Sequence, residues 1–187
     1  MKRRHYRRPN SCLICLVAAT LLAPGWLSLA AEPSPNKLTE EDKAGGWKLL
    51  FDGTTGRGWH AYKRQTFPTN EWLIEGGWFH CLGKTTGRLG DDLVTDAEFD
   101  NFELEWDWKQ LPSGNSGVKY FVSEKTNNPL GHEYQMIDDD RNPDAKAAQG
   151  KRVTASLYDV LKLDRPAPTK PPGETNHSKI VVKGNQA

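Results

Sequence analysis

The residues best suited to chemistry lie in one short stretch, residues 130–140, which reads LGHEYQMIDDD. Successive side chains of an extended strand point to opposite faces, so Glu133 and Gln135 would share one face and Tyr134 and Met136 the other. A carboxylate can accept a proton, and an amide can hydrogen-bond a sugar hydroxyl. The pattern therefore indicates a polar strand that faces a sugar, although a plain solvated sheet face stays an alternative.

A pair of carboxyl groups would suit a glycosidase, which needs one proton donor and one ionised group. A bulge at the end of this strand could bring Asp138 or Asp139 beside Glu133. The position between them on that face is Gln135, however, and a neutral amide accepts no proton usefully. The residues thus favour sugar binding more clearly than a two-carboxylate mechanism.

The second candidate constellation is PSGNSG, residues 112–117, at a predicted strand entrance. Gly114 and Gly117 permit tight backbone geometry, and Asn115 supplies a side-chain donor and acceptor. The stretch is either an ordinary hairpin turn or a loop that presents Asn115 to a ligand.

No metal site or cofactor is predicted. Residues 138–144, DDDRNPD, resemble a calcium loop in composition only, because the regular alternation, the glycine and the glutamate at the twelfth position are absent; calcium stays possible without support. The histidines form no H-x-H, H-E-x-x-H or Cys/His cluster, which excludes a recognisable zinc motif. There is no G-x-S-x-G elbow and no glycine-rich phosphate loop.

The elements that must position these residues are short strands. Apolar or alternating runs separated by Gly, Pro, Asn and Asp predict an all-β fold, an antiparallel two-sheet β-sandwich or barrel. The clearest run is NFELEWDWKQL, in which four residues are expected to face the core: Phe102, Leu104, Trp106 and Trp108. The predicted strands fall within residues 47–51, 71–81, 92–99, 101–111, 116–124, 132–138, 154–161 and 178–184.

The first thirty residues differ from the rest. A basic start, an apolar core and small residues near Ala30 predict a signal peptide over residues 1–30, hence an exported protein, periplasmic or extracellular. A membrane anchor is the alternative, but Pro24 and Gly25 interrupt the apolar stretch, so no membrane association is expected after cleavage. Residues 31–45 read as a linker that ends in a short helical turn capped by Thr39.

Removal of the leader reverses the sign of the net charge. Residues 1–30 carry five of the 25 Lys and Arg and none of the 24 Asp and Glu, which leaves 20 against 24 and a net charge of −4 in place of +1. A mature chain with this charge is not expected to bind nucleic acid.

Five blocks in one order resemble the 3-keto-disaccharide hydrolase domain, a family common in secreted bacterial proteins and formerly without assigned function. The blocks are GWKLLFDGTTGRGWHAY, EWLIEGGWFHC, LVTDAEFDNFELEWDWKQLPSGNSGVKY, EYQMIDDD and KPPGETNHSKIVVKGN. The resemblance assigns residues 46–187 to this domain. The resemblance implies a concanavalin-A-like jelly roll with a carbohydrate cleft. It also implies cleavage of glycosides oxidised at carbon 3, by base-assisted elimination followed by hydration.

The resemblance carries over Glu133 and Asp138 as candidate catalytic residues, and Asn115, Gln135 and Tyr158 as candidate substrate-binding residues. Glu133 is expected to act as the base, since this route needs one general base and an electrophile for the enolate. The expected partner is an oligosaccharide or glycoside. A non-catalytic, lectin-like sugar-binding module and a structural interaction domain are the two competing hypotheses.

The sequence departs from the family pattern at two places. Thr175 stands where the family usually has an aromatic residue, and the family continues beyond VVKGN with a further strand and a hairpin. We therefore expect a jelly roll that lacks its last strands.

Overall fold

The structure is a computed structural model that describes residues 1–4, 35–83 and 91–184. Most of the predicted signal peptide, residues 5–30, lies outside the described residues.

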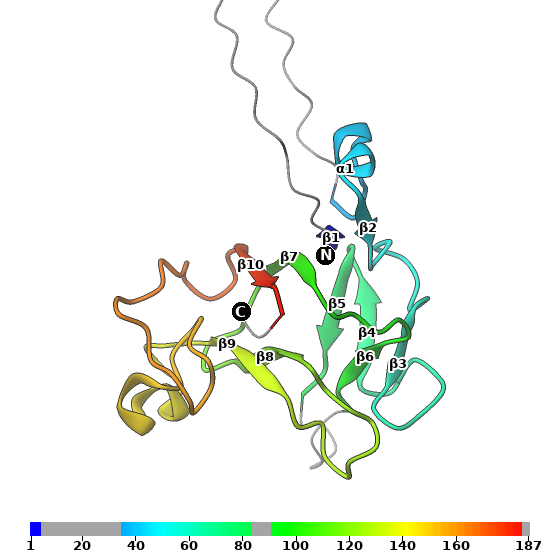
Figure 1. Cartoon of the computed structure of the whole chain (residues 1–187). Helices are drawn as coiled ribbons and strands as arrows, with labels where there is room; N and C mark the ends of the chain where they lie inside the picture. The colour runs from blue at the N-terminus through cyan, green and yellow to red at the C-terminus, as the bar shows by residue number, and fades with distance from the viewer. Residues whose placement is uncertain (5–34, 84–90, 185–187) are drawn as a thin grey trace, which may run out of the picture.

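Antiparallel strands make up nearly all of the regular structure (Figure 1). The strands are β1 (Lys2–Arg4), β2 (Trp47–Leu49), β3 (Trp59–Ala61), β4 (Trp72–Glu75), β5 (Trp78–Cys81), β6 (Leu93–Thr95), β7 (Phe102–Trp108), β8 (Asn115–Tyr120), β9 (His132–Ile137) and β10 (Asn176–Val182). The helices are α1 (Glu40–Ala44) and two 3-10 helices, η1 (Pro143–Lys146) and η2 (Ala148–Gly150). The predicted all-β, antiparallel fold class is confirmed.

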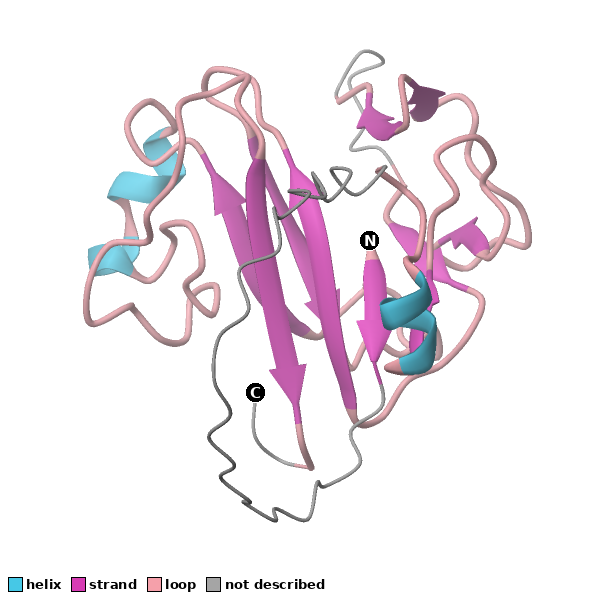
Figure 2. Ribbon diagram, turned by 90° about the horizontal axis from the view of Figure 1, so that it is seen from above, coloured by secondary structure: helices cyan, strands magenta, loops and turns pink. Residues whose placement is uncertain are grey.

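Four of the strands form one sheet in the order β10-β7-β1-β2, and the others pair as β3-β6, β4-β5 and β8-β9. Figure 2 shows the longer strands running alongside one another, with the helices at the periphery.

The core lies between the β7-β10 pair and the β8-β9 hairpin. Phe102, Leu104, Trp106 and Trp108 of β7 are buried, as their alternation predicted, and cluster with Ile180 and Val182 of β10. Four side chains of the hairpin pack against this cluster from the facing sheet: Val118, Tyr120, Tyr134 and Met136. Two apolar faces that pack together in this way form the expected sandwich.

The orientation of the hairpin follows from this packing. Because alternate side chains point to opposite faces, burial of Tyr134 and Met136 in the core turns Glu133 and Gln135 outward from it. We call this outward side of the hairpin the site face. It carries Asn115, Gly117 and Lys119 of β8 opposite Ile137, Gln135 and Glu133 of β9.

The β1 strand occupies an interior position of the four-stranded sheet. Its three residues pair with β7 on one side and β2 on the other, with Arg3 opposite both Leu104 and Lys48. Met1 packs against the core cluster, and its carbonyl accepts a hydrogen bond from the Leu50 N–H at 3.2 Å. The sequence did not predict that this end of the chain joins the sheet.

Three local predictions are corrected or confirmed. Residues 154–161 are not a strand, because positive φ at Ala155 and Asp159 breaks the extended backbone and leaves only isolated bridges. β8 ends at Tyr120 rather than continuing, since Phe121 has a φ of 59°. The capping role of Thr39 is confirmed, as its hydroxyl accepts from the Asp42 N–H at 3.0 Å.

Within the described ranges, no helix has both the length and the apolar character needed to cross a membrane.

Candidate functional site

Glu133 lies on the site face directly over Gly117. Its register partner on β8 is Lys119, whose Nζ lies 4.0 Å from Glu133 Oε2. A methyl group at position 117 would lie 2.7 Å from Glu133 Cγ and 2.8 Å from Cδ, closer than real contacts allow. The absence of a side chain at Gly117 therefore makes the room in which the Glu133 carboxyl lies.

The Glu133 carboxyl is partly withdrawn from water and lacks donors. Its side chain is 23% exposed, and within the described residues no hydrogen bond reaches either oxygen. Burial raises its pKa, Lys119 opposes that rise, and the negative charges of Asp92 and Asp144 add to it. A carboxylate with a raised pKa and free lone pairs is a suitable proton acceptor.

Lys119 links this carboxyl to a second one. Its Nζ donates to Asp92 Oδ2 at 3.4 Å, and its side chain is 32% exposed. The ammonium thus lies at the open surface of the site face, between two acids.

Asp144 gathers several of the neighbouring polar groups. Its Oδ2 accepts from the Tyr158 hydroxyl at 3.0 Å and from Asn115 Nδ2 at 3.4 Å, and its Oδ1 accepts from Arg152 Nη1 at 2.6 Å. Burial alone would raise the pKa of Asp144, but the hydrogen bonds from Arg152 and Tyr158 outweigh it and lower that pKa. Asp144 therefore brings together Asn115 and Tyr158, two of the predicted substrate-binding residues.

Gln135 lies beneath this group rather than at its surface. Its side chain is fully buried, and its Nε2 donates to Asn115 Oδ1 at 3.2 Å. The structure therefore places Gln135 where it orients Asn115, and not where it would touch a ligand directly.

Asp138 has a different setting from Glu133. Its side chain is 3% exposed and accepts from the backbone N–H groups of Ser113 at 2.9 Å and of Asp140 and Arg141 at 3.3 Å. The hydrogen bond from Ser113, the largest influence, lowers its pKa.

The structure has no bulge in β9 of the kind that could have brought Asp138 or Asp139 beside Glu133. Residues 132–137 of β9 pair one-to-one with β8, so Asp138 is not brought beside Glu133. Its geometry fits a carboxylate that fastens the turn after β9, and its predicted catalytic role gains no support.

The acidic turn does not gather its side chains around a common point. Asp138 faces the backbone of residues 113, 140 and 141, while Asp139 Oδ1 accepts from the Thr154 N–H at 2.8 Å. Across the three described ranges, no group of three or more His, Cys, Asp or Glu side chains could hold a metal ion.

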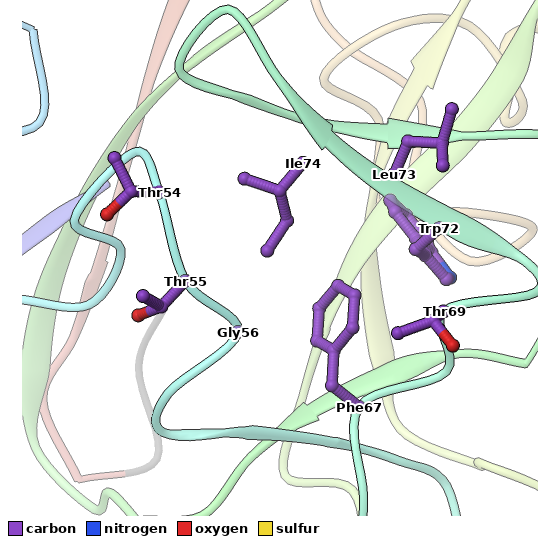
Figure 3. A pocket seen from close by; sticks show the side chains of 8 residues that line it. All are labelled: Thr54, Thr55, Gly56, Phe67, Thr69, Trp72, Leu73 and Ile74. Carbon is purple, nitrogen blue, oxygen red and sulfur yellow. The ribbon is translucent and has the colours of Figure 1, made fainter.

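An open apolar pocket of about 380 Å³ lies elsewhere, between the loop at residues 54–56 and β4 (Figure 3). It is lined by Thr54, Thr55, Gly56, Phe67, Thr69, Trp72, Leu73 and Ile74. None of these side chains is ionisable, so this pocket offers no general base. The chemistry is better placed on the site face of the hairpin.

Three polar residues of the site were not singled out from the sequence: Lys119, Asp144 and Arg152. The alternation of β8 could have found Lys119, because Asn115, Gly117 and Lys119 share one face. Asp144 lies in η1 and Arg152 in a turn after η2, and no periodic pattern places them near Asn115.

Comparisons with known proteins agree with this fold. The sequence profile of the 3-keto-alpha-glucoside-1,2-lyase-like domain matches residues 46–187. A 3-keto-disaccharide hydrolase of Bacteroides thetaiotaomicron is 38% identical over 156 residues, covering 74% of this chain and 53% of that protein. The chain thus spans about half the length of that curated relative.

A solved structure supports the same relationship. The crystal structure of a candidate glycosyl hydrolase from Parabacteroides distasonis ATCC 8503 superposes with a TM-score of 0.69 and 35% identity, covering 79% of this chain and 69% of the other. The resemblance found in the sequence is confirmed. Because the family profile spans most of its length, this chain belongs to the 3-keto-alpha-glucoside-1,2-lyase-like domain family.

Proposed function

We propose that this protein cleaves the glycosidic bond of 3-keto-disaccharides and related 3-keto-glycosides. The observation that carries the proposal is the Glu133 carboxyl, which is half-buried, raised in pKa and without hydrogen-bond donors among the described residues. The name of the Bacteroides thetaiotaomicron relative supplies the substrate class.

A ketone at carbon 3 acidifies the hydrogen on carbon 2, which is what lets one base start the reaction. Glu133 takes this proton, and the electrons of the C–H bond pass into an enolate. The enolate then collapses, a double bond forms between carbons 1 and 2, and the C1–O bond to the aglycone breaks. The departing oxygen takes a proton from water.

Hydration completes the cycle. The hydroxide left by that water adds to carbon 1, and carbon 2 recovers its proton from Glu133. The net reaction consumes one water and restores the carboxylate. This route needs a single base, so it does not require Asp138 as a second acid.

The other polar side chains are assigned to binding. Asn115 and Tyr158 are both tied to Asp144 and flank the open side of the site face. We assign them to the sugar hydroxyls, with Gln135 fixing the orientation of Asn115 from beneath.

The test is release of nitrophenol from a nitrophenyl 3-keto-glucoside by the wild-type protein and by Glu133→Gln. The amide keeps the shape of the side chain and removes its basicity, so kcat should fall about 10²- to 10⁴-fold. Calorimetric binding of the substrate should persist in the variant. Turnover that survives the substitution would remove Glu133 as base, and sugar binding without turnover by the wild type would favour a lectin-like module.

We also propose that the protein is exported, from the basic and apolar pattern of residues 1–30. Cleavage after this leader would remove β1, the strand that joins β2 to β7. N-terminal sequencing of the protein from fractionated cells tests the proposal: an intact Met1 in the cytoplasmic fraction would contradict it.

A further inference from the structure

We propose that Lys119 is a catalytic residue whose ammonium binds the oxygen on carbon 3 as that oxygen becomes negative in the enolate. This inference rests on the proposed function, since it assigns the electrophile for the same reaction. The argument is geometric: Lys119 is the register partner of Glu133, and its Nζ lies 4.0 Å from Glu133 Oε2.

The reaction requires the base and the electrophile to be close neighbours. The proton leaves carbon 2 while charge develops on the oxygen of carbon 3, and a single carbon–carbon bond separates the two carbons. A donor that serves this oxygen must therefore lie within a few ångström of the base. Lys119 meets this requirement from the adjacent strand.

The other side-chain donors of the site are directed toward Asp144 or are buried. The Tyr158 hydroxyl and Asn115 Nδ2 both donate to Asp144 Oδ2, and Gln135 is fully buried. Arg152 is held by Asp144 and by Asp159, with hydrogen bonds of 2.6 to 3.1 Å.

Lys119 retains donor capacity. An ammonium has three N–H groups, and one hydrogen bond joins Lys119 Nζ to Asp92 at 3.4 Å. Its side chain is 32% exposed, so a ligand on the site face can reach it. Asp92 holds the ammonium on the side of Glu133 without saturating it.

Lys119 acts on the enolate without exchanging a proton. Glu133 takes the carbon 2 proton, the C–H electron pair forms the enolate, and Lys119 stabilises the resulting negative oxygen without giving up a proton. When the C=O bond re-forms and the aglycone leaves, Lys119 returns to its starting state. Electrostatic stabilisation of this kind acts on the transition state and therefore on kcat.

The experiment compares the full-length wild type with Lys119→Met, Lys119→Arg and Asp92→Asn, using a nitrophenyl 3-keto-glucoside. A second readout is exchange of the carbon 2 hydrogen of 3-keto-glucose in D₂O, which reports enolate formation without a leaving group. Lys119→Met should lower both rates about 10²- to 10³-fold, mainly through kcat. Lys119→Arg should restore part of the loss, because it keeps the charge and a donor.

The outcomes separate this inference from the proposed function. Lys119→Met with both rates within threefold of wild type, alongside an inactive Glu133→Gln, would overturn the role of Lys119 and leave the base in place. A rise in KM alone in Lys119→Met, with kcat unchanged, would show that Lys119 only binds the substrate and would also overturn its catalytic role. A wild type that neither releases nitrophenol nor exchanges hydrogen would overturn both proposals. Asp92→Asn should change kcat less than Lys119→Met, because the ammonium remains.

Discussion

The space above Gly117 gives a sharp test of the site. In Gly117→Ala, the new methyl group would lie 2.8 Å from Glu133 Cδ and 2.7 Å from Cγ, whereas ordinary contact begins at 3.4 Å. Ordinary contact therefore requires the carboxyl carbon to retreat by about 0.6 Å. The backbone φ at Gly117 is not in the left-handed region, so alanine introduces no backbone strain there and the clash with Glu133 is the only effect expected.

Displacement of a correctly charged base lowers the rate without removing the chemistry. A shift of about 1 Å in a reacting group can cost on the order of 10²-fold in rate, so kcat for a 3-keto-glucoside should fall by about this factor. The assay is nitrophenol release at saturating substrate, with circular dichroism to confirm that the variant is folded.

A matched control separates the site from general strain. Gly56→Ala would press a methyl group against Phe67, whose Cγ would lie 2.6 Å away, at the pocket of Figure 3 rather than on the site face. It should lower the melting temperature and leave kcat close to wild type. The double variant Gly117→Ala/Glu133→Gln should be no slower than Glu133→Gln alone. Gly117→Ala with kcat within threefold of wild type would refute the placement of the base.

Further predictions concern pH and the core. The rate constant kcat/KM should rise with pH through the pKa of Glu133, which burial raises above its usual value of 4.5, and a limb at or below 4.5 in the pH–rate profile would contradict this. Leu104→Ala should lower the free energy of unfolding by about 2 to 5 kcal/mol in urea titrations, because it empties a buried position of β7. Burial lowers the pKa of His60, but its hydrogen bonds with Asp96 at 2.7 Å and Glu124 at 3.1 Å outweigh this and raise it. The contribution of His60 to the free energy of unfolding is therefore complete below the pKa of an unfolded histidine, about 6.5, and is lost as pH rises through the pKa of His60 in the folded protein. Melting temperatures measured from pH 5.5 to 8.5 should show this loss in the wild type and not in His60→Gln.

The sequence was most informative where one physical rule acted alone. The alternation in NFELEWDWKQL placed Phe102 and Trp108 in the core, because a strand half-covered by another sheet must divide its side chains between two faces. The same rule put Glu133 on the outward face of β9. In both cases the alternation can be read within a single strand. Its interpretation requires only that one face of the sheet packs on the core and the other does not, which is common for antiparallel sheets.

Predictions failed where a single backbone angle or a distant segment decided the outcome. Nothing in the composition of residues 154–161 indicates that Ala155 and Asp159 adopt positive φ, which ends any strand there. Asp144 becomes part of the site through hydrogen bonds to Asn115, 29 residues earlier, and to Tyr158, 14 residues later. Such contacts depend on how η1 and the following turns return to the hairpin, and no periodicity encodes that path.

The contrast between Glu133 and Asp138 shows which property separates a base from a structural acid. Both are acidic residues of one short stretch, and the amino-acid composition of that stretch does not distinguish their roles. Asp138 accepts hydrogen bonds from three backbone N–H groups, which stabilise its charge and lower its pKa. Glu133 has no donor among the described residues, and burial raises its pKa. A carboxylate whose negative charge is stabilised by hydrogen bonds binds a proton weakly, whereas a partly buried carboxylate without such bonds binds a proton more tightly. The proton acceptor that we propose for this site is therefore the acid to which no described residue donates a hydrogen bond.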